Sequence, residues 1–191
     1  PFTMPPSADQ AIAATRSWIE RAVIGLNLCP FAKAVYVRDQ IRFVVSEAQT
    51  REALLEDLEL ELGLLNEAAS NAVDTTLLIH PRVLADFRDY NDFLEVADAL
   101  VVQLDLEGVL QVASFHPQYQ FAGTAKNDVG NFTNRSPYPT LHLLRESSVD
   151  AAVAAFPDAG DIYLKNIDTL QKLGVAGWLA LGMAGTADRR H

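Results

Sequence analysis

The chain has 191 residues, of which 49 % are apolar and 21 % charged, a composition typical of a globular protein and not of a disordered or low-complexity chain. Its formal net charge of −10 argues against nucleic acid as a partner, because a duplex would repel the chain unless its basic residues were segregated. No apolar stretch approaches the roughly 20 residues of a membrane-spanning helix, so we expect no membrane partner and one folded domain.

The cysteine content and the first residues indicate a compartment. The single cysteine, Cys29, excludes an internal disulfide framework and fits a reducing environment. Residues 1–6 show neither the basic nor the apolar segment of a secretory signal. We therefore expect a cytoplasmic protein whose ends, residues 1–6 and 182–191, are frayed.

The first part of the chain alternates between helical and extended patterns. Apolar residues recur at helical spacing over residues 7–28, with Ser7 as the N-cap. Two runs rich in β-branched and aromatic residues, 34–37 and 41–45, surround a short polar turn and predict a β-hairpin. Thr50 then caps a long helix over residues 50–69, in which leucines recur every three or four positions and acidic residues occupy the other face.

The remaining elements are predicted from the lengths of the apolar runs and from the residues that interrupt them. The apolar run 75–79 is too short for a helix and predicts a buried strand that ends at His80-Pro81. A helix is expected over residues 86–104, then a strand over 109–115 that ends at His116-Pro117. Residues 118–138 have no periodicity and predict a long polar loop, a feature that is often functional. Helices are expected after Pro139, at residues 140–146, 148–155 and 158–173.

This order of elements predicts an α/β protein, more specifically an α+β sandwich with helices packed on a four-stranded mixed sheet. Strands joined through helices should run parallel, with the first hairpin strand as their antiparallel neighbour. The carboxyl ends of the strands that lead to His80 and His116 would then meet at one edge of the sheet. Open α/β sheets commonly bind ligands at that edge.

Two interpretations stay open for these histidines. Neutral imidazoles in a cleft act as general acids or bases, or bind a metal together with a further ligand such as His142, Asp128 or Cys29, although no close-spaced metal motif is present. Alternatively, each histidine ends its strand by bonding to a backbone carbonyl group. We favour this second interpretation for His80 and a catalytic acid–base role for His116. His142 lies in a run of leucines and is typical of a packing residue.

The densest polar cluster of the chain lies at residues 131–139. Its arginine carries a planar guanidinium group suited to carboxylate or phosphate, and the stretch 111–145 has three basic residues against one acidic residue on an otherwise acidic chain. We predict a site for a small anionic molecule formed by Arg135, Asn134, Ser136, Tyr119 and Arg145. The alternative is that the cluster only satisfies turns and that the arginine pairs with an acidic helix.

Cys29 is the second candidate catalytic residue, as a nucleophile. A nucleophilic thiol needs a lowered pKa, and the expected end of the first helix at this residue acts in the opposite direction. Lys33, Arg38 and Arg21 are near enough in sequence to compensate, whereas a lone cysteine in an apolar run is usually buried packing. The Cys-Pro dipeptide also occurs at some haem-regulated sites but is too common to identify a cofactor.

Three strings of residues carry a resemblance to a known family. They are GLNLCPFA at residues 25–32, SFHP at 114–117, and TNRSPYP at 133–139 followed by LHLLRE at 141–146. They resemble an uncharacterised bacterial family catalogued as domain of unknown function 1415, and the resemblance covers nearly the whole chain. It implies a stand-alone bacterial protein and carries over no activity.

We therefore predict a small-molecule enzyme acting on an anionic metabolite that bears phosphate or carboxylate. His116 would be the acid–base, Arg135 and Asn134 the anion clamp, and Cys29 the candidate nucleophile. The alternative is a regulatory module that binds an anion, a metal or haem without turnover. The glycine-rich loops that bind NAD, FAD or ATP are absent from the sequence, and no cofactor is assigned.

Overall fold

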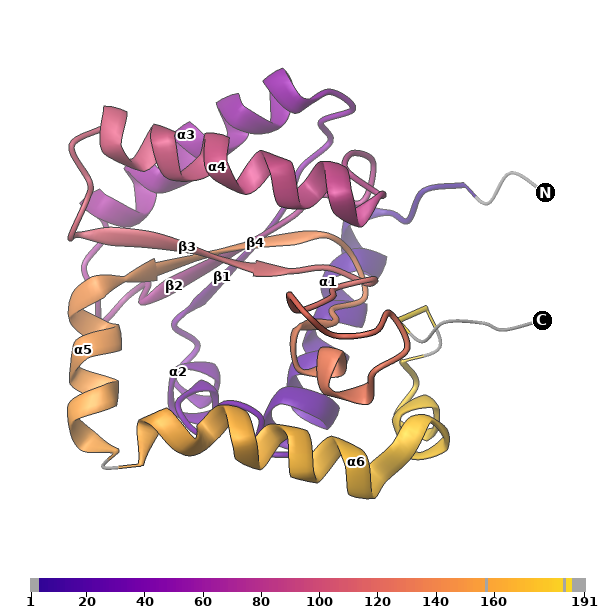
Figure 1. Ribbon diagram of the computed structural model, residues 1–191. Coiled ribbons are helices and arrows are strands. Elements are labelled where there is room, and N and C mark those ends of the chain that lie inside the picture. The colour runs from indigo at the N-terminus through magenta and orange to yellow at the C-terminus, as the bar shows by residue number, and fades with distance from the viewer. Residues whose placement is uncertain (1–3, 157, 184, 187–191) are drawn as a thin grey trace.

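The computed structural model describes residues 4–156, 158–183 and 185–186 (Figure 1). Much of the predicted frayed ends, residues 1–3, 184 and 187–191, lies outside the described residues. Of the predicted C-terminal tail, Met183 and Thr186 are described and both are buried. No helix in the described ranges combines the length and the apolar character needed to cross a membrane.

The helices and strands follow one another in a mixed order. They are α1 (Ala8–Trp18), the π-helix η1 (Ile19–Ile24), α2 (Ala32–Val37), β1 (Ile41–Val45), α3 (Arg51–Glu67), β2 (Thr75–Ile79), α4 (Phe87–Gln103), β3 (Leu110–Phe115), the 3₁₀ helix η2 (Val129–Asn134), β4 (Thr140–Arg145), α5 (Glu146–Ala155), the 3₁₀ helix η3 (Ala159–Asp161) and α6 (Ile162–Ala180).

The strands form a four-stranded mixed sheet in the order β1-β2-β4-β3. β1 and β2 are parallel, while β4 runs antiparallel to both of its neighbours, β2 and β3. The predicted α+β arrangement of a four-stranded mixed sheet covered by helices is confirmed. The N-caps expected at Ser7 and Thr50 are also confirmed, because each side-chain oxygen accepts a hydrogen bond from an amide of the first helical turn.

The predicted hairpin is wrong. Residues 34–37 belong to the helix α2, and β1 pairs in parallel with β2 through contacts such as Phe43 with Leu77. Residues 35 and 36 in α2 turn toward the apolar interior below the sheet, while Val37 is 73 % exposed. Their β-branched and aromatic side chains reflect this packing, which overrides the weak preference of these residues for strands.

The helix predicted at residues 140–146 is also wrong, because residues 140–145 form β4 in the middle of the sheet. Alternate side chains point to opposite faces of a strand, and here both faces are covered. Leu141 and Leu143 are fully buried with α3 and α4, whereas His142 and Leu144 face the other side. A strand buried on both faces has leucines in nearly continuous order, a pattern that also occurs in a short helix.

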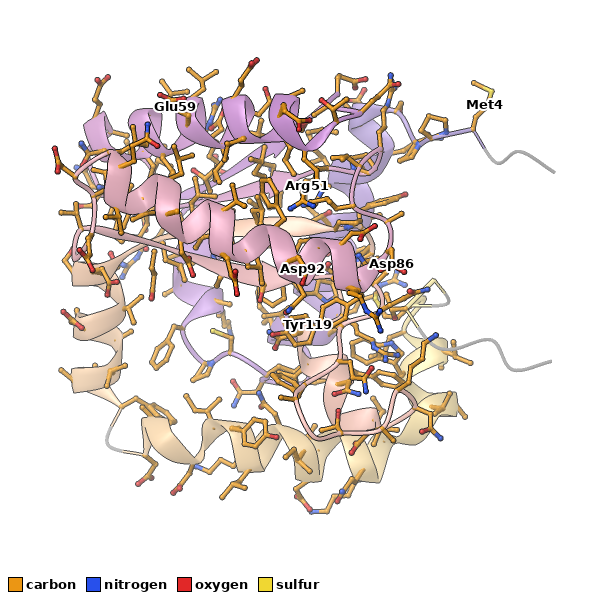
Figure 2. The ribbon with its side chains drawn as sticks, turned by 45° about the horizontal axis from the view of Figure 1, so that its top comes forward. Met4, Arg51, Glu59, Asp86, Asp92 and Tyr119 are labelled. Atoms are coloured by element: carbon orange, nitrogen blue, oxygen red, sulfur yellow. The ribbon has the colours of Figure 1, made fainter. Side chains whose placement is uncertain are left out.

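Helices cover both faces of the sheet, and Figure 1 shows α3 and α4 on one side with α1, α2, α5 and α6 on the other. The first face is packed by the leucines of α3, among them Leu54 and Leu58, against Leu78 and Leu141 of the sheet. Acidic residues such as Glu59 point outward from α3, as Figure 2 shows. The second face is built around Trp18 and Trp178 and is the side on which an apolar cavity lies.

Candidate functional site

His80 and His116 lie at the same edge of the sheet. β2 and β3 are both antiparallel to the strand between them, so their carboxyl ends point the same way. Tyr90 of α4 contacts both imidazoles, with ring centroids 5.7 Å from His80 and 4.9 Å from His116. Its hydroxyl group donates to the carbonyl oxygen of Thr140 at 2.7 Å and accepts from the amide of Phe115 at 3.1 Å. The edge is therefore closed by a packed aromatic cluster.

Both ring nitrogens of His116 are engaged. Nε2 lies 3.0 Å from the carbonyl oxygen of Leu84, which can only accept, so Nε2 carries the proton. Nδ1 accepts a hydrogen bond from the amide of Gln118 at 3.0 Å. The side chain is fully buried, and burial lowers its pKa. These contacts favour the strand-ending interpretation, and the acid–base role of His116 stays a prediction.

His80 makes a related contact. Its Nδ1 lies 3.0 Å from the carbonyl oxygen of Val83, while Nε2 is sealed from solvent and has no hydrogen-bond partner among the described residues. Burial lowers the pKa of His80 to about 4. Together the two histidines hold the turn after β2, in which Leu84 adopts a left-handed backbone conformation with φ of 60°.

Arg135 is buried, with 2 % of its surface exposed. Its guanidinium group donates to three backbone carbonyl oxygens, those of Tyr119 at 3.0 Å, Thr186 at 2.9 Å and Lys126 at 2.7 Å. It also stacks over the ring of Phe132. The contacts tie the long loop to the C-terminal segment, and they favour a structural role over the predicted anion clamp.

The side chains of the other predicted anion ligands do not converge on Arg135. Asn134 donates to the carbonyl oxygen of Ser114 at 3.1 Å, and Ser136 donates to that of Tyr138 at 2.6 Å. Tyr119 packs beside the start of α4, 5.1 Å from the ring of Phe87, and Figure 2 shows it below that end of the helix. Arg145 lies at the opposite end of β4, where its Nη2 reaches the carbonyl oxygens of Leu65, Ala68 and Val73 at 2.8, 2.6 and 2.9 Å and closes the end of α3.

A polar cleft of about 580 Å³ opens beside the loop. Its lining comes half from the start of α4 and half from the loop, and consists of Asp86, Phe87, Arg88, Asn91, Gln118, Gln120, Ala122 and Lys126. Neither His80, His116 nor Arg135 is among the lining residues. Asp86 caps α4, since its carboxylate accepts from the amides of Arg88 and Asp89 at 2.8 and 3.3 Å. The sequence predicted a functional loop at residues 118–138, and this loop forms one side of the cleft. No feature of the sequence indicated that the start of α4 forms the other side.

A second cavity, of about 330 Å³, lies between the other face of the sheet and the helices α2 and α5. Its lining is almost entirely apolar and consists of Trp18, Ile19, Val23, Cys29, Phe31, Ala32, Val35, Ile41, Asp74, Thr75, Leu77, Phe115, His142, Leu144, Ser148, Val149, Ala152 and Val153. The hydroxyl groups of Ser148 and Thr75 donate hydrogen bonds within the protein. Ser148 donates to the carboxylate of Asp74 at 2.7 Å, and Thr75 donates to the carbonyl oxygen of Leu143 at 2.6 Å.

Cys29 and His142, far apart in the chain, both line this cavity. His142 lies in the central strand with Leu77 and Ala113 as its neighbours across the ladders. Burial lowers its pKa to about 4, so the imidazole is neutral at pH 7. Cys29 is a free, half-buried thiol. The sequence indicated both residues individually but not that they share one cavity, because its walls come from segments distant in the chain.

A metal site formed by the three predicted histidines is not supported. His80 and His116 contact α4 on one face of the sheet, whereas His142 faces the cavity on the other. Within the ranges that the structure describes, no group of three or more His, Cys, Asp or Glu side chains is arranged to hold a metal ion.

Comparison with known proteins identifies the family of the chain. No curated protein matches it, and no solved structure does. The family model described as "Protein of unknown function (DUF1415)" matches residues 10–180, a range that includes every residue lining the polar cleft and the apolar cavity, as well as His80, His116 and Arg135. The match agrees with the resemblance carried by the three strings, and the chain belongs to this family of proteins of unknown function.

Proposed function

We propose that the protein binds a small, largely apolar molecule in the cavity between the sheet and the helices α2 and α5. The observation that carries the proposal is the cavity itself, about 330 Å³ with an almost wholly apolar lining. Ligand sites in proteins are typically concave, mostly apolar and roughly 300–1,000 Å³ in volume, with a few polar groups that set orientation. A volume at the lower end of that range suits a ligand about the size of a single substituted ring.

The packing of α2 and α5 supports access to the cavity. Neither helix contains a fully buried residue in the described chain, in contrast to α3 and α4 on the other face. Phe31, just before α2, meets Phe156, just after α5, edge to face at 5.8 Å. Segments with few buried apolar contacts open at low free-energy cost, so a ligand would enter between these two helices.

This proposal takes up the binding module that the sequence left as an alternative and changes the expected ligand. The cavity lining contains no lysine or arginine, and its one carboxylate, Asp74, is paired with Ser148. Transfer of an anion into such an environment is unfavourable because no positive charge compensates for its lost hydration. Cys29 keeps its place as a candidate nucleophile, since its thiol lies in the lining of this cavity.

Ala152→Phe is expected to abolish binding of toluene, which serves as an uncharged probe. Ala152 lies on α5 in the cavity lining, so a phenyl group there occupies the space that toluene would take. In the unmodified protein, toluene at ten times its Kd should stabilise the fold by about 1.4 kcal/mol, a rise in Tm of roughly 4 °C. Differential scanning calorimetry measures the rise. The same toluene concentration should also slow alkylation of Cys29 by N-ethylmaleimide about tenfold, which mass spectrometry follows without ambiguity because the sequence has one cysteine.

The matched control is Ala151→Phe. Ala151 is exposed on the same helix and does not line the cavity, so this variant should retain both the thermal shift and the protection of Cys29. A toluene shift that is missing from the unmodified protein, or equally large in Ala152→Phe, would reject the cavity as a binding site.

We propose anion binding in the polar cleft as a second candidate function, and the observation that favours it is the pair of cationic side chains in the cleft. Arg88 from α4 and Lys126 from the loop both line its 580 Å³ volume. The loop is the one in which the sequence predicted an anion site, although the cations concerned differ from Arg135. The carboxylate of Asp86 lines the same cleft and weakens its positive potential.

Inorganic phosphate is expected to bind the cleft with an affinity that falls at least about tenfold in the double variant Arg88→Ala/Lys126→Ala. Isothermal titration calorimetry at low ionic strength provides the measurement. The control is Lys33→Ala/Arg38→Ala, which removes the same charge from exposed positions near α2. Equal phosphate affinity in the two double variants would show non-specific attraction and remove this candidate.

A further inference from the structure

We infer that the ligand of the apolar cavity is a small neutral molecule carrying one hydroxyl group, and that His142 recognises this group through a ring nitrogen. The inference rests on the proposed function of the cavity and names the chemical class of its ligand. Phenols of one ring are the simplest members of that class.

The position of His142 is the first step. Its imidazole belongs to the floor of the cavity, where its neighbours are the apolar side chains of Leu77, Leu144 and Phe115, the last with its ring centroid 5.6 Å away. An imidazole carries one hydrogen-bond donor and one acceptor, and leaving them unpaired in apolar surroundings costs stability. Leucine would pack this central strand without that cost.

The second step concerns the hydrogen-bond partners of His142. The ring nitrogens of His142 form no hydrogen bond with any side chain or backbone group in the described part of the chain, yet they are not among the unpartnered polar atoms sealed from a water-sized molecule. The indole Nε1 of Trp18, which also lines the cavity, is sealed in this way. Because protein surrounds His142 on its other sides, its accessible nitrogens face the cavity.

The hydroxyl groups of the lining already donate hydrogen bonds within the protein. Ser148 and Asp74 are bonded to each other, and Thr75 is bonded to the backbone of the neighbouring strand. Of the other polar groups, the thiol of Cys29 bonds only weakly and the carboxylate of Asp74 can accept but not donate, so His142 is the group left to both donate and accept. A hydroxyl group matches a neutral imidazole in either sense, because it donates to the bare nitrogen or accepts from the protonated one.

The walls define the rest of the ligand. The rings of Trp18, Phe31 and Phe115 line the cavity together with aliphatic side chains, so a flat apolar ring finds both area and edge-to-face partners. No cationic side chain in the lining would compensate for a carboxylate or phosphate on the ligand. The chemistry that fits is one aromatic ring with one uncharged hydroxyl group.

The test compares p-cresol with toluene, two molecules that differ by a single hydroxyl group. In the unmodified protein p-cresol should bind about fivefold more tightly than toluene, the usual net contribution of one hydrogen bond. In His142→Phe, which keeps a ring of similar size, toluene affinity should stay within about twofold, while p-cresol affinity should fall at least about tenfold. Isothermal titration calorimetry gives all four constants.

The control is Ala151→Phe, which adds a ring outside the cavity lining and should leave the p-cresol to toluene ratio unchanged. A second measurement is made on the unmodified protein, and the variant is used only to assign the signals. In protein labelled with ¹⁵N-histidine, p-cresol should shift the ring-nitrogen resonances of His142 by several ppm and toluene should not, with the assignment taken from the signals that His142→Phe lacks.

The outcomes separate the two claims. If neither probe binds the unmodified protein, the proposed function fails and the inference fails with it. If both probes bind but p-cresol neither binds more tightly nor shifts the imidazole nitrogens, the cavity stands as a binding site and the recognition by His142 is overturned. A p-cresol preference that survives in His142→Phe overturns it equally.

Discussion

Arg135→Met is expected to destabilise the protein by about 4 kcal/mol, because it leaves three backbone carbonyl groups without the donor that satisfies them. The carbonyl oxygens of Tyr119, Lys126 and Thr186 all accept from this one buried guanidinium group. Methionine preserves much of the side-chain volume, so the loss reports on the hydrogen bonds more than on a cavity. Urea unfolding followed by tryptophan fluorescence measures the change in the free energy of unfolding.

Two further variants sharpen this result. Arg135→Lys keeps the positive charge, but one ammonium group does not span three carbonyl oxygens that a planar guanidinium reaches together, so most of the destabilisation should remain. Arg38→Met, at an exposed position after α2, should change stability by less than about 0.5 kcal/mol. If Arg135→Met were as stable as Arg38→Met, the guanidinium would be dispensable for folding, and the predicted anion clamp would regain its support.

Acidification from pH 7 to pH 4 is expected to lower the free energy of unfolding by about 3 kcal/mol for each of His80 and His142. Burial holds the pKa of both imidazoles at about 4 in the folded protein, whereas the ordinary value near 6.5 applies to the unfolded chain. Between these values the unfolded chain takes up protons that the folded protein does not, so stability is complete above about pH 6.5 and declines as the pH falls to 4. Urea unfolding at several pH values follows the decline.

Single variants assign the decline to its source. Each of the variants His142→Phe and His80→Asn removes one imidazole, so each should reduce the loss of stability between pH 7 and pH 4 by the contribution of that histidine. The carboxylates contribute equally to all three proteins, so their effect cancels when the pH profiles are subtracted from one another. The titratable groups that face each imidazole are few, namely His116 and Tyr90 toward His80, and Asp74 and Cys29 in the cavity of His142. Profiles of equal slope in the unmodified protein and both variants would contradict the low pKa values.

The elements predicted correctly are those whose signals are local and strong. α3 and α4 have N-cap residues at Thr50 and Asp86 and apolar residues at regular helical spacing, and the fully buried β2 is too short to be a helix. α2 and β4, predicted as a strand and a helix, are six residues each and have compositions compatible with either structure, and the 3₁₀ helix η2 lies within residues predicted as a loop. One predicted strand is a helix and one predicted helix is a strand, so the number of strands remains four. The fold class was therefore predicted correctly although the strand pairing was not.

By itself the sequence determined the class of the sheet and its longer helices, because hydrophobic periodicity is a property of contiguous residues, and it predicted that His80 and His116 meet at one edge. It also named Arg135 as an anion ligand, Cys29 as a candidate nucleophile and His142 as a packing residue or a further metal ligand. Only the tertiary structure decided what each of them contacts. The carbonyl groups around Arg135 come from two distant segments, and the cavity of Cys29 and His142 is a volume left between helices and strands that are separate in the chain. Hydrogen-bond partners and empty space arise only when such segments pack together, and no local pattern encodes them.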